Sequence, residues 1–341
     1  MRFSMFRDYI SLLRTLTFKR FFNGVKVAVS FYLSRLLRKT IHWGMPMSLS
    51  VEPTNICNLK CPECPTGMKI LTRRSGTLHP ELFRKIIDQV YPTTPYLTLY
   101  FQGEPYLNPD FFNFVNYARK KKMYVTTSTN GHFLNEANCE KTVSSGLSKL
   151  IISVDGTTQD VYQQYRVGGD LQTVIRGIKC LMETKKKMNS LYPFVVLQFI
   201  VFRQNEHQID EIRRIARETG VDFLALKTAQ VYDYESGKNI IPENIKYSRY
   251  RKTKDGTYII QNKYYNHCWR SWQSCVMTWD GHIVPCCFDK DARYKAGSVL
   301  EKPFREIWHS ESLNTFRQNI LKARKNIDIC TNCTEGTKIW I

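Results

Sequence analysis

The stretch Ser48-Leu-Ser-Val-Glu-Pro-Thr-Asn-Ile-Cys57-Asn-Leu-Lys-Cys61-Pro-Glu-Cys64 joins a short β-rich run to three closely spaced cysteines. The run Ser48–Pro53 is typical of a buried strand. The cysteines follow it within a single loop, so their sulfurs can converge on one cluster. Three thiolates on a four-iron cluster leave one iron open to an external ligand. The stretch therefore predicts a reactive iron–sulfur cluster after a strand. Zinc is the alternative, although zinc would need a fourth ligand close by.

The chain after this stretch alternates β-rich runs with helical patterns. We expect five further strands, at Leu97–Phe101, Met123–Thr129, Lys149–Val154, Phe194–Phe202 and Asp222–Leu226. Helical patterns lie between them, near residues 80–90, 109–121, 135–145, 171–188 and 206–219. Such alternation implies parallel strands with right-handed crossovers. Six units predict an α/β fold, a partial (β/α)6 TIM-like barrel, with its chemistry at the C-terminal ends of the strands.

The composition excludes several classes of protein. The 341 residues include 43% hydrophobic residues, enough for a sizeable core and too many for general disorder. No apolar run approaches the roughly 20 residues that span a bilayer, and no signal peptide is visible. We therefore expect a cytoplasmic protein, in which metal binding rather than disulfide formation is the leading explanation for the 11 cysteines. The net charge is +20, but no nucleic-acid-binding module is recognisable, so we expect no nucleic-acid partner.

The N-terminal segment, residues 1–47, is basic and amphipathic. Its only acidic residue is Asp8. One face of a predicted helix is apolar and consists of Met5, Phe6, Tyr9, Ile10, Leu12, Leu13 and Leu16. This face could lie in an anionic membrane surface, as a peripheral contact at the inner side of the membrane. Alternatively, it packs over the following domain and the basic face is merely solvated.

The cysteine triad, with Glu-Pro-Thr-Asn before it, resembles the CxxxCxxC loop of the radical S-adenosylmethionine (SAM) superfamily. Three strand ends resemble the SAM-binding segments of that family: Gln102-Gly103-Glu104-Pro105, Ser128-Thr129-Asn130-Gly131 and Ser153-Val154-Asp155-Gly156. The resemblance implies a [4Fe-4S] cluster on Cys57, Cys61 and Cys64. It also implies SAM contacts from Gly103, Glu104, Ser128, Thr129, Asn130, Ser153, Asp155 and Arg166. Gln102 and Glu63 depart from the family pattern, where a glycine and an aromatic residue are usual.

Each of these SAM-site residues has a purely structural alternative. Gly103 and Gly131 could serve turns, Asp155 could belong to an ordinary turn with Gly156, and Asn130 could cap a helix. Their joint placement at consecutive strand ends favours the SAM site.

A second cysteine group near the C-terminus resembles the SPASM or shortened twitch extension of radical SAM enzymes. A hairpin is expected at Asp280-Gly281, between Cys275–Trp279 and His282–Val284. The resemblance implies one auxiliary [4Fe-4S] cluster, with ligands Cys268, Cys286, Cys330 and Cys333. Adjacent residues of a strand point to opposite faces, so Cys286 and Cys287 should not both be ligands. Cys275 or Cys287 could replace a chosen ligand, and a zinc ribbon on the same cysteines is the alternative.

Four segments follow from these assignments. They are the N-terminal segment at 1–47, the radical SAM barrel at 48–227, a Tyr- and Lys-rich connection at 228–266, and a small cysteine-rich α+β auxiliary-cluster domain at 267–341. A short hairpin is expected at Asp255-Gly256 within the connection.

The resemblance implies a radical SAM oxidoreductase or modifying enzyme. Such an enzyme takes an electron from a low-potential donor, a flavodoxin or ferredoxin, and cleaves SAM to a 5′-deoxyadenosyl radical. The radical abstracts hydrogen from a substrate that the sequence does not identify. The substrate is either a small molecule or surface-polymer precursor, or else a peptide or protein. A non-catalytic iron–sulfur electron carrier and a zinc-binding interaction protein are the other classes considered.

Overall fold

The computed structural model describes residues 2–236, 239–261 and 265–336. The chain forms two compact units. Unit 1 consists of Met1–Ile10, Cys57–Ile70 and Thr126–Asn262, and unit 2 of Ser11–Ile56, Leu71–Val125 and Lys263–Ile341. Strand β3 (Tyr124–Thr129) begins in unit 2 and continues into unit 1.

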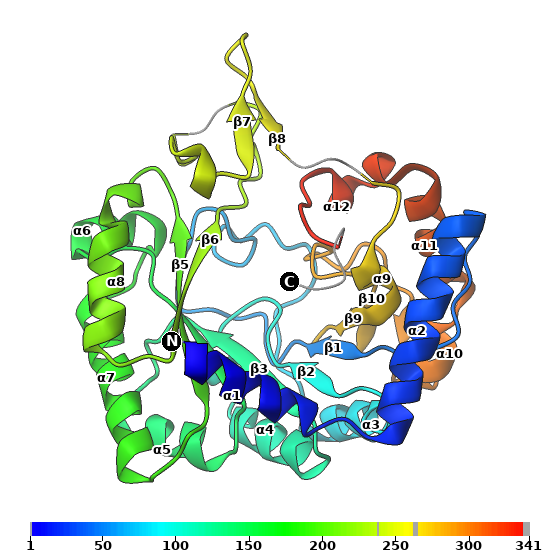
Figure 1. The fold of residues 1–341 in the computed structure, drawn as a ribbon, viewed down its shortest axis with the longest axis horizontal. Helices are drawn as coiled ribbons and strands as arrows, with labels where there is room; N and C mark the ends of the chain where they lie inside the picture. Colours follow the sequence, from blue (N-terminus) through cyan, green and yellow to red (C-terminus); the bar gives the residue numbers. More distant parts are fainter. Residues whose placement is uncertain (1, 237–238, 262–264, 337–341) are drawn as a thin grey trace. The chain divides into compact units, whose positions relative to one another are not determined.

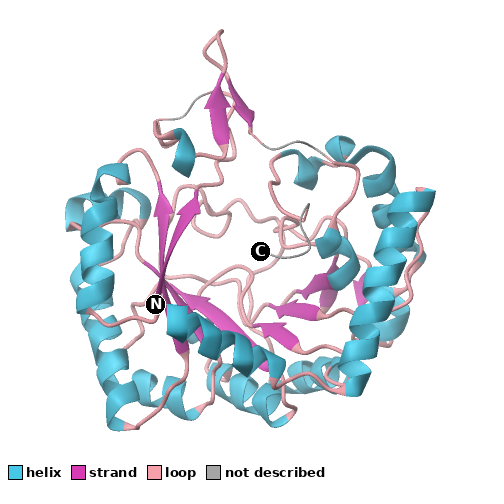
Figure 2. Ribbon diagram, viewed as in Figure 1, coloured by secondary structure: helices cyan, strands magenta, loops and turns pink. Residues whose placement is uncertain are grey.

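Unit 1 is built on parallel strands. The end of β3 pairs with β4 (Lys149–Ser153), β4 with β5 (Phe194–Val201), and β5 with β6 (Phe223–Thr228). The connecting helices are α5 (Glu136–Ser144), α6 (Gln159–Tyr165), α7 (Leu171–Lys187) and α8 (Ile209–Glu218), with the 3-10 turn η2 (Glu206–Gln208). They lie outside the strands of the unit (Figures 1 and 2). A separate antiparallel pair follows, β7 (Tyr250–Lys252) with β8 (Tyr258–Ile260), and before it the 3-10 turn η3 (Ile245–Tyr247).

Unit 2 holds a mixed sheet in the order β11, β10, β9, β1, β2. Its strands are β1 (Ser48–Val51), β2 (Tyr96–Thr98), β9 (Ser274–Met277), β10 (His282–Val284) and β11 (Gly297–Ser298). Its helices are α2 (Phe18–Leu37), α3 (Pro80–Val90), α4 (Phe111–Lys120), α9 (Trp269–Gln273), α10 (Phe304–Trp308), α11 (Glu311–Ala323) and α12 (Asp328–Thr331). Two 3-10 turns belong to it, η1 (Pro105–Leu107) and η4 (Arg324–Asn326).

Local sequence signals explain several of these elements. Helix α3 begins with a proline in its first turn, where the missing N–H costs nothing. It buries Phe83, Ile86, Ile87 and Val90, whose spacing of three and four residues places them on one face. The side chain of Asp170 accepts a hydrogen bond from the Thr173 N–H and caps α7.

The predicted α/β class with parallel strands is confirmed. All six expected strands form, and α3, α4, α5, α7 and α8 lie where the helical patterns were expected. Both hairpins also form, with β9 antiparallel to β10 and β7 antiparallel to β8. The sequence did not reveal that β9 pairs in parallel with β1, joining the C-terminal segment to the first strand. It also did not reveal α2 as a helix of 20 residues.

The packing alternative expected helix α1 (Arg2–Leu13) to bury its apolar face, but much of that face is exposed. Phe6, Tyr9 and Leu13 are more than half exposed, whereas Asp8 is buried. Asp8 forms an ion pair with Lys149 at 2.5 Å, and in unit 1 Arg7 pairs with Asp222 at the same distance. The expectation that the whole apolar stripe packs is therefore wrong: Met5, Ile10 and Leu12 are half-buried, the rest of the stripe is exposed, and ion pairs help to fasten the helix. Among the described residues, no helix is both long and apolar enough to cross a membrane.

Candidate active site

The loop that carries Cys57, Cys61 and Cys64 lies in unit 1 and is tightly folded. The Cys64 N–H donates to the Cys61 carbonyl at 3.2 Å, and the Leu59 N–H donates to the Cys57 Sγ at 3.5 Å. A Cβ at Gly67 would come within 2.5 Å of the Cys61 backbone, so only glycine fits this close crossing. All three thiols are free. The loop is therefore shaped by its own backbone, with thiols available as ligands.

The buried thiol of Cys61 lies against Arg166, just after α6. One guanidinium nitrogen, Nη1, is 3.9 Å from the Cys61 Sγ. Burial raises the pKa of the Cys61 thiol, and Arg166 acts in the opposite sense because a cation favours the thiolate. Cys61 also packs in an apolar cluster of unit 1 with Leu59 and Phe202.

Asp155 holds Arg166 in place. The Asp155 Oδ2 accepts from the Arg166 Nε at 2.6 Å, and its Oδ1 accepts from the Ile200 N–H at 2.7 Å. Burial by itself would lower the pKa of Arg166, but the Asp155 carboxylate outweighs it and raises that pKa well above its usual value. The Asn205 side chain donates to the Asp155 carbonyl at 2.9 Å, so the segment that follows β5 also fixes the loop after β4.

Asn130, at the end of β3, reaches the cysteine loop. Its Nδ2 donates to the Asn58 Oδ1 at 2.7 Å and lies 4.0 Å from the Cys57 Sγ. Its Oδ1 accepts from the His132 N–H at 3.1 Å, and the His132 ring accepts in turn from the Asp170 N–H. The structure thus brings Asn130 and Arg166 to two different cysteines of one loop.

The other expected SAM contacts in unit 1 lie in the strands themselves. Ser128 and Thr129 close β3, beside Ile151 and Ile152 of β4, and Ser153 closes β4 beside Gln198. Ser128 is half-buried, while Thr129 and Ser153 are buried. These three residues occupy neighbouring C-terminal strand ends, as expected for a parallel sheet.

Gly103 and Glu104 belong to unit 2, directly after β2. Gly103 has φ 75°, and a Cβ there would lie 2.5 Å from the Thr54 carbonyl oxygen. The Glu104 N–H donates to the Ile56 carbonyl at 2.8 Å, and its carboxylate accepts from the Tyr106 N–H at 3.2 Å. The glycine therefore lets the segment after β2 run against the residues that precede Cys57.

The C-terminal cysteines gather around Arg324 in unit 2. Its Nη2 is 3.3 Å from the Cys333 Sγ, and thiolates at Cys268, Cys333 and Cys330 counter the effect of burial and raise the pKa of Arg324. The Arg324 Nε is buried and has no hydrogen-bond partner within the described residues. A buried N–H donor of this kind suits an iron–sulfur cluster, because the cluster sulfurs accept hydrogen bonds.

Cys286 and Cys287 do not lie in a strand, because β10 ends at Val284 and the two cysteines follow it in a turn. The strand assumed at these two residues is therefore wrong, and the argument for opposite faces that rested on it no longer applies. The neighbouring Cys286 thiol lowers the pKa of Cys287 to about 6. Cys275 is different: it is buried in β9, and burial raises the pKa of its thiol, which the Arg317 cation opposes.

Both cysteine groups fit iron–sulfur clusters by the chemistry of their donors. Each consists of thiols that an N–H group approaches: the Leu59 amide at Cys57 and the Glu335 amide at Cys333, the latter at 3.3 Å. Hydrogen bonds to sulfur tune the potential of such clusters. Within the described residues, no three His, Cys, Asp or Glu side chains are placed so that they could hold a single metal ion.

Residues 51–216 match the family model described as "Radical SAM superfamily". The chain belongs to the radical SAM superfamily. Residues 268–334 of this radical SAM protein match the SPASM model, an "Iron-sulfur cluster-binding domain". The protein is therefore a radical SAM enzyme that uses SAM and a [4Fe-4S] cluster and has an auxiliary iron–sulfur domain.

Several known proteins resemble this radical SAM enzyme along most of its length. A "tungsten-containing aldehyde ferredoxin oxidoreductase cofactor-modifying protein" of Pyrococcus furiosus is 26% identical over 314 residues, covering 84% of this chain and 86% of its own. Mycofactocin maturase MftC of Mycobacterium tuberculosis is 23% identical over 311 residues, covering 84% and 75%. Streptococcus suis SuiB bound to precursor peptide SuiA superposes with a TM-score of 0.60 at 16% identity, covering 80% and 67%. This last likeness establishes the fold.

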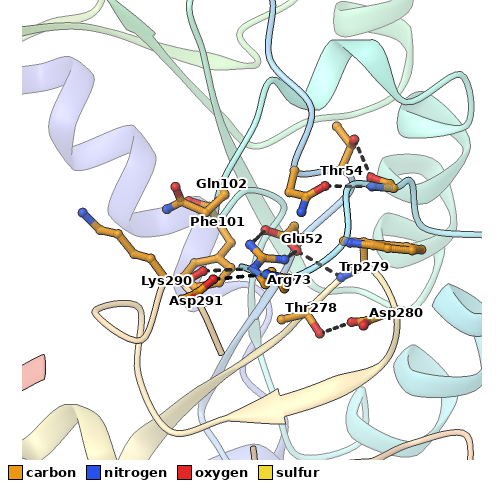
Figure 3. A network of polar contacts seen from close by, with 12 residues as sticks. Glu52, Thr54, Arg73, Phe101, Gln102, Thr278, Trp279, Asp280, Lys290 and Asp291 are labelled. Atoms are coloured by element: carbon orange, nitrogen blue, oxygen red, sulfur yellow. Dashed lines mark hydrogen bonds and ion pairs between the residues drawn. The ribbon is translucent and has the colours of Figure 1, made fainter. Parts of the chain in front are cut away.

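A buried ion pair in unit 2 forms hydrogen bonds that connect the radical SAM region to the SPASM region (Figure 3). Glu52 follows β1, and both of its carboxylate oxygens accept from Arg73 at 2.6 Å. The Trp279 N–H also donates to Glu52 at 3.2 Å, and the Arg73 Nε donates to the Lys290 carbonyl at 3.0 Å. Thr72 adds two hydrogen bonds to the Asp291 carboxylate.

Sequence reasoning missed most of the residues that support the site. Asn58 and His132 orient Asn130, and Asn205 anchors the loop of Asp155. Glu52 stands in the Glu-Pro-Thr-Asn segment before the triad, so its place was visible in the sequence. Its partner Arg73 was not, because a pair separated by 21 positions leaves no local pattern.

Proposed function

We propose that this enzyme binds its catalytic [4Fe-4S] cluster through Cys57, Cys61 and Cys64 and its SAM through residues at the strand ends. The observation that carries the proposal is the contact of the Asp155-held Arg166 with the Cys61 thiol. A SAM carboxylate would meet a fixed guanidinium there. Gly103, Glu104, Ser128, Thr129, Asn130 and Ser153 complete the proposed SAM contacts.

When bound, the cluster supplies the electron that cleaves SAM to methionine and a 5′-deoxyadenosyl radical, which takes a hydrogen atom from the substrate. The task of the protein is to orient SAM and to exclude water. Arg166 is suited to orienting SAM because it donates a hydrogen bond to Asp155, whose other carboxylate oxygen is held by the Ile200 N–H. Glu104 is buried and is suited to receive the SAM ammonium group.

One auxiliary [4Fe-4S] cluster on Cys268, Cys286, Cys330 and Cys333 forms part of the proposal. Arg324 supports it, because its guanidinium touches Cys333 and keeps one buried donor without a protein partner in the described region. Such a cluster could accept the electron that the substrate radical gives up, making the net reaction an oxidation or a cross-link. The first electron would come from a flavodoxin or ferredoxin.

The proposed division of the chain has boundaries at 48, 228 and 267. The barrel at 48–227 holds the catalytic cluster, and the domain at 267–341 holds the auxiliary cluster. The connection at 228–266 lies between them in sequence; its residues 237–238 and 262–264 are outside the described part of the chain.

The substrate class follows from two different observations. The exposed apolar and basic N-terminal helices favour a substrate reached at a membrane, such as a lipid-linked small molecule or surface-polymer precursor. The relatives favour the second candidate, modification of a peptide or cofactor, since their names describe maturation, cofactor modification and a complex with a precursor peptide. We propose the first class, in a cytoplasmic enzyme with peripheral contact to anionic lipid.

The test is an anaerobic assay of the reconstituted protein. With dithionite it should convert SAM to 5′-deoxyadenosine, and the variant Cys57→Ala/Cys61→Ala/Cys64→Ala should form none. Persistent cleavage by that variant would remove the triad from the site. A substrate screen with lipid-linked sugars and with peptides then separates the two classes by hydrogen transfer into 5′-deoxyadenosine.

A further inference from the structure

Helix α2 presents an apolar face away from the protein. Phe18 and Leu36, near its two ends, are 86% and 79% exposed. Between them five more exposed apolar residues recur at intervals of three and four positions: Phe21, Phe22, Val25, Val29 and Tyr32. This spacing places all seven on one side of the helix. We call these seven residues the α2 outer face.

The fold does not need the α2 outer face. The opposite side of the helix provides the packing, where Val27 and Phe31 join Trp269 and Trp272 in an apolar cluster. Arg20 is buried on this inner side, and its guanidinium donates to the carbonyls of Thr15, Tyr91, Lys121 and Lys122. Figure 1 shows α2 on the outer side of its own unit, next to α9 and α11. A single apolar stripe of this size on a surface marks an interaction site.

The charged residues of α2 itself are all positive. By helical periodicity Lys19 and Lys26 lie along one edge and Arg35 along the other, and Arg38 and Lys39 follow the helix. The sequence contains no Asp or Glu between Asp8 and Glu52. None of these five cations forms an ion pair in the part of the chain that the structure describes.

A hollow of about 230 Å³ opens beside the α2 outer face. The lining residues include three cations, Lys19, Lys26 and Arg305, together with His309, and no carboxylate. Trp43, more than half exposed, stands in the same lining. Cations next to an apolar stripe suit a phosphate group attached to a lipid, and tryptophan is favoured at the level of the headgroups.

We infer that the α2 outer face docks onto an anionic phospholipid membrane and that the hollow receives a lipid phosphate. The inference rests on the proposed membrane contact and names the surface and ligand chemistry for it. A second copy of this chain fits less well, because a two-fold contact through α2 would set cations against cations. A lipid surface pairs the stripe with acyl chains and the cations with phosphates.

The test is flotation of the full-length protein with vesicles. One set consists of phosphatidylcholine alone and the other of phosphatidylcholine with phosphatidylglycerol. Wild type should bind the second set and be released by high salt, because the ionic attraction is screened. The outer-face variant Phe18→Ser/Phe22→Ser/Leu36→Ser should lose about tenfold or more in affinity. The hollow variant Lys19→Gln/Lys26→Gln/Arg305→Gln should lose its preference for phosphatidylglycerol.

The matched control is Phe6→Ser/Tyr9→Ser, which removes exposed apolar residues of α1, and it should lose far less affinity than the outer-face variant. Melting temperature and SAM cleavage, measured on every variant, show that the fold and the catalytic site are intact. If the α1 control alone loses binding, the membrane contact stands but the surface assignment is wrong. If wild type binds no vesicle, both the contact and this inference are overturned. A wild-type dimer that the outer-face variant dissociates, without vesicle binding, would assign the surface to a second copy.

Discussion

Arg166 contacts the Cys61 thiol and is held in place by Asp155. We expect Arg166→Gln to lower SAM affinity by about tenfold or more, because a charge-assisted hydrogen bond to the SAM carboxylate is lost. The control Arg176→Gln changes an exposed arginine of α7 and should leave affinity unchanged. Equilibrium dialysis with labelled SAM measures both. Equal affinity in both variants would remove Arg166 from the SAM site.

Gly103 permits a close approach that no other residue allows. Its φ is positive, and a Cβ at this position would lie 2.5 Å from the Thr54 carbonyl oxygen, so both features exclude a side chain. We expect Gly103→Ala to destabilise the protein by roughly 2 kcal/mol or more. Thermal unfolding measures this. Gly220→Ala is the control, because its φ is also positive but nothing lies within 4 Å of its Cβ position. A smaller loss in Gly103→Ala than in the control would contradict the crowding argument.

Cys286 and Cys287 compete for one ligand position, since they are neighbours in the turn after β10. We expect Cys286→Ser to lower the iron content by about four atoms per chain, because a cluster with an incomplete ligand set is lost. Cys287→Ser and the control Cys275→Ser should keep all the iron. Iron and sulfide analysis after anaerobic reconstitution decides between them. Loss in Cys287→Ser with retention in Cys286→Ser would exchange the two roles.

At the scale of elements, the Glu52–Arg73 pair fastens the end of β1 to the hairpin of β9 and β10. Arg73→Met would leave the fully buried Glu52 carboxylate without its cation, at a cost of roughly 3–5 kcal/mol. Adding Glu52→Met should recover most of that loss, since replacing both partners removes the uncompensated charge.

Chemical denaturation of the two variants measures the difference between them. Arg74→Met serves as the control because Arg74 is exposed, and it should change stability by less than about 0.5 kcal/mol. A double variant as unstable as Arg73→Met would show that packing, not charge, is what matters at this place.

At the scale of the whole molecule, the two cysteine groups belong to different units. We expect the variant Cys268→Ala/Cys330→Ala/Cys333→Ala to keep about four irons and to form 5′-deoxyadenosine still. The triad variant should keep the auxiliary iron and form none. Iron analysis and product chromatography on both proteins give the result. Loss of all iron from either variant would mean that one cluster cannot assemble without the other.

The succession of strands along the chain, the cysteine loop and the family could all be predicted from the sequence. The six strands and five helices could be predicted because the hydrophobic pattern of each element lies within a few consecutive residues. The triad at 57–64 is local as well, since three ligands lie within one loop. The C-terminal cysteines also revealed their domain, because their spacing matched a known pattern.

How these parts support one another depends on contacts between residues that are distant in the chain. Strand β9 pairs with β1 across more than 200 residues, and Glu52 meets Arg73 and Trp279, contacts that no periodicity encodes. The faces of α1 and α2 were likewise hidden: both helices bury polar residues, Asp8 in one and Arg20 in the other. Hydrophobic periodicity locates the apolar side of a helix. Whether that side faces the core depends on the partners that distant residues supply, here Lys149 for Asp8 and backbone carbonyls for Arg20.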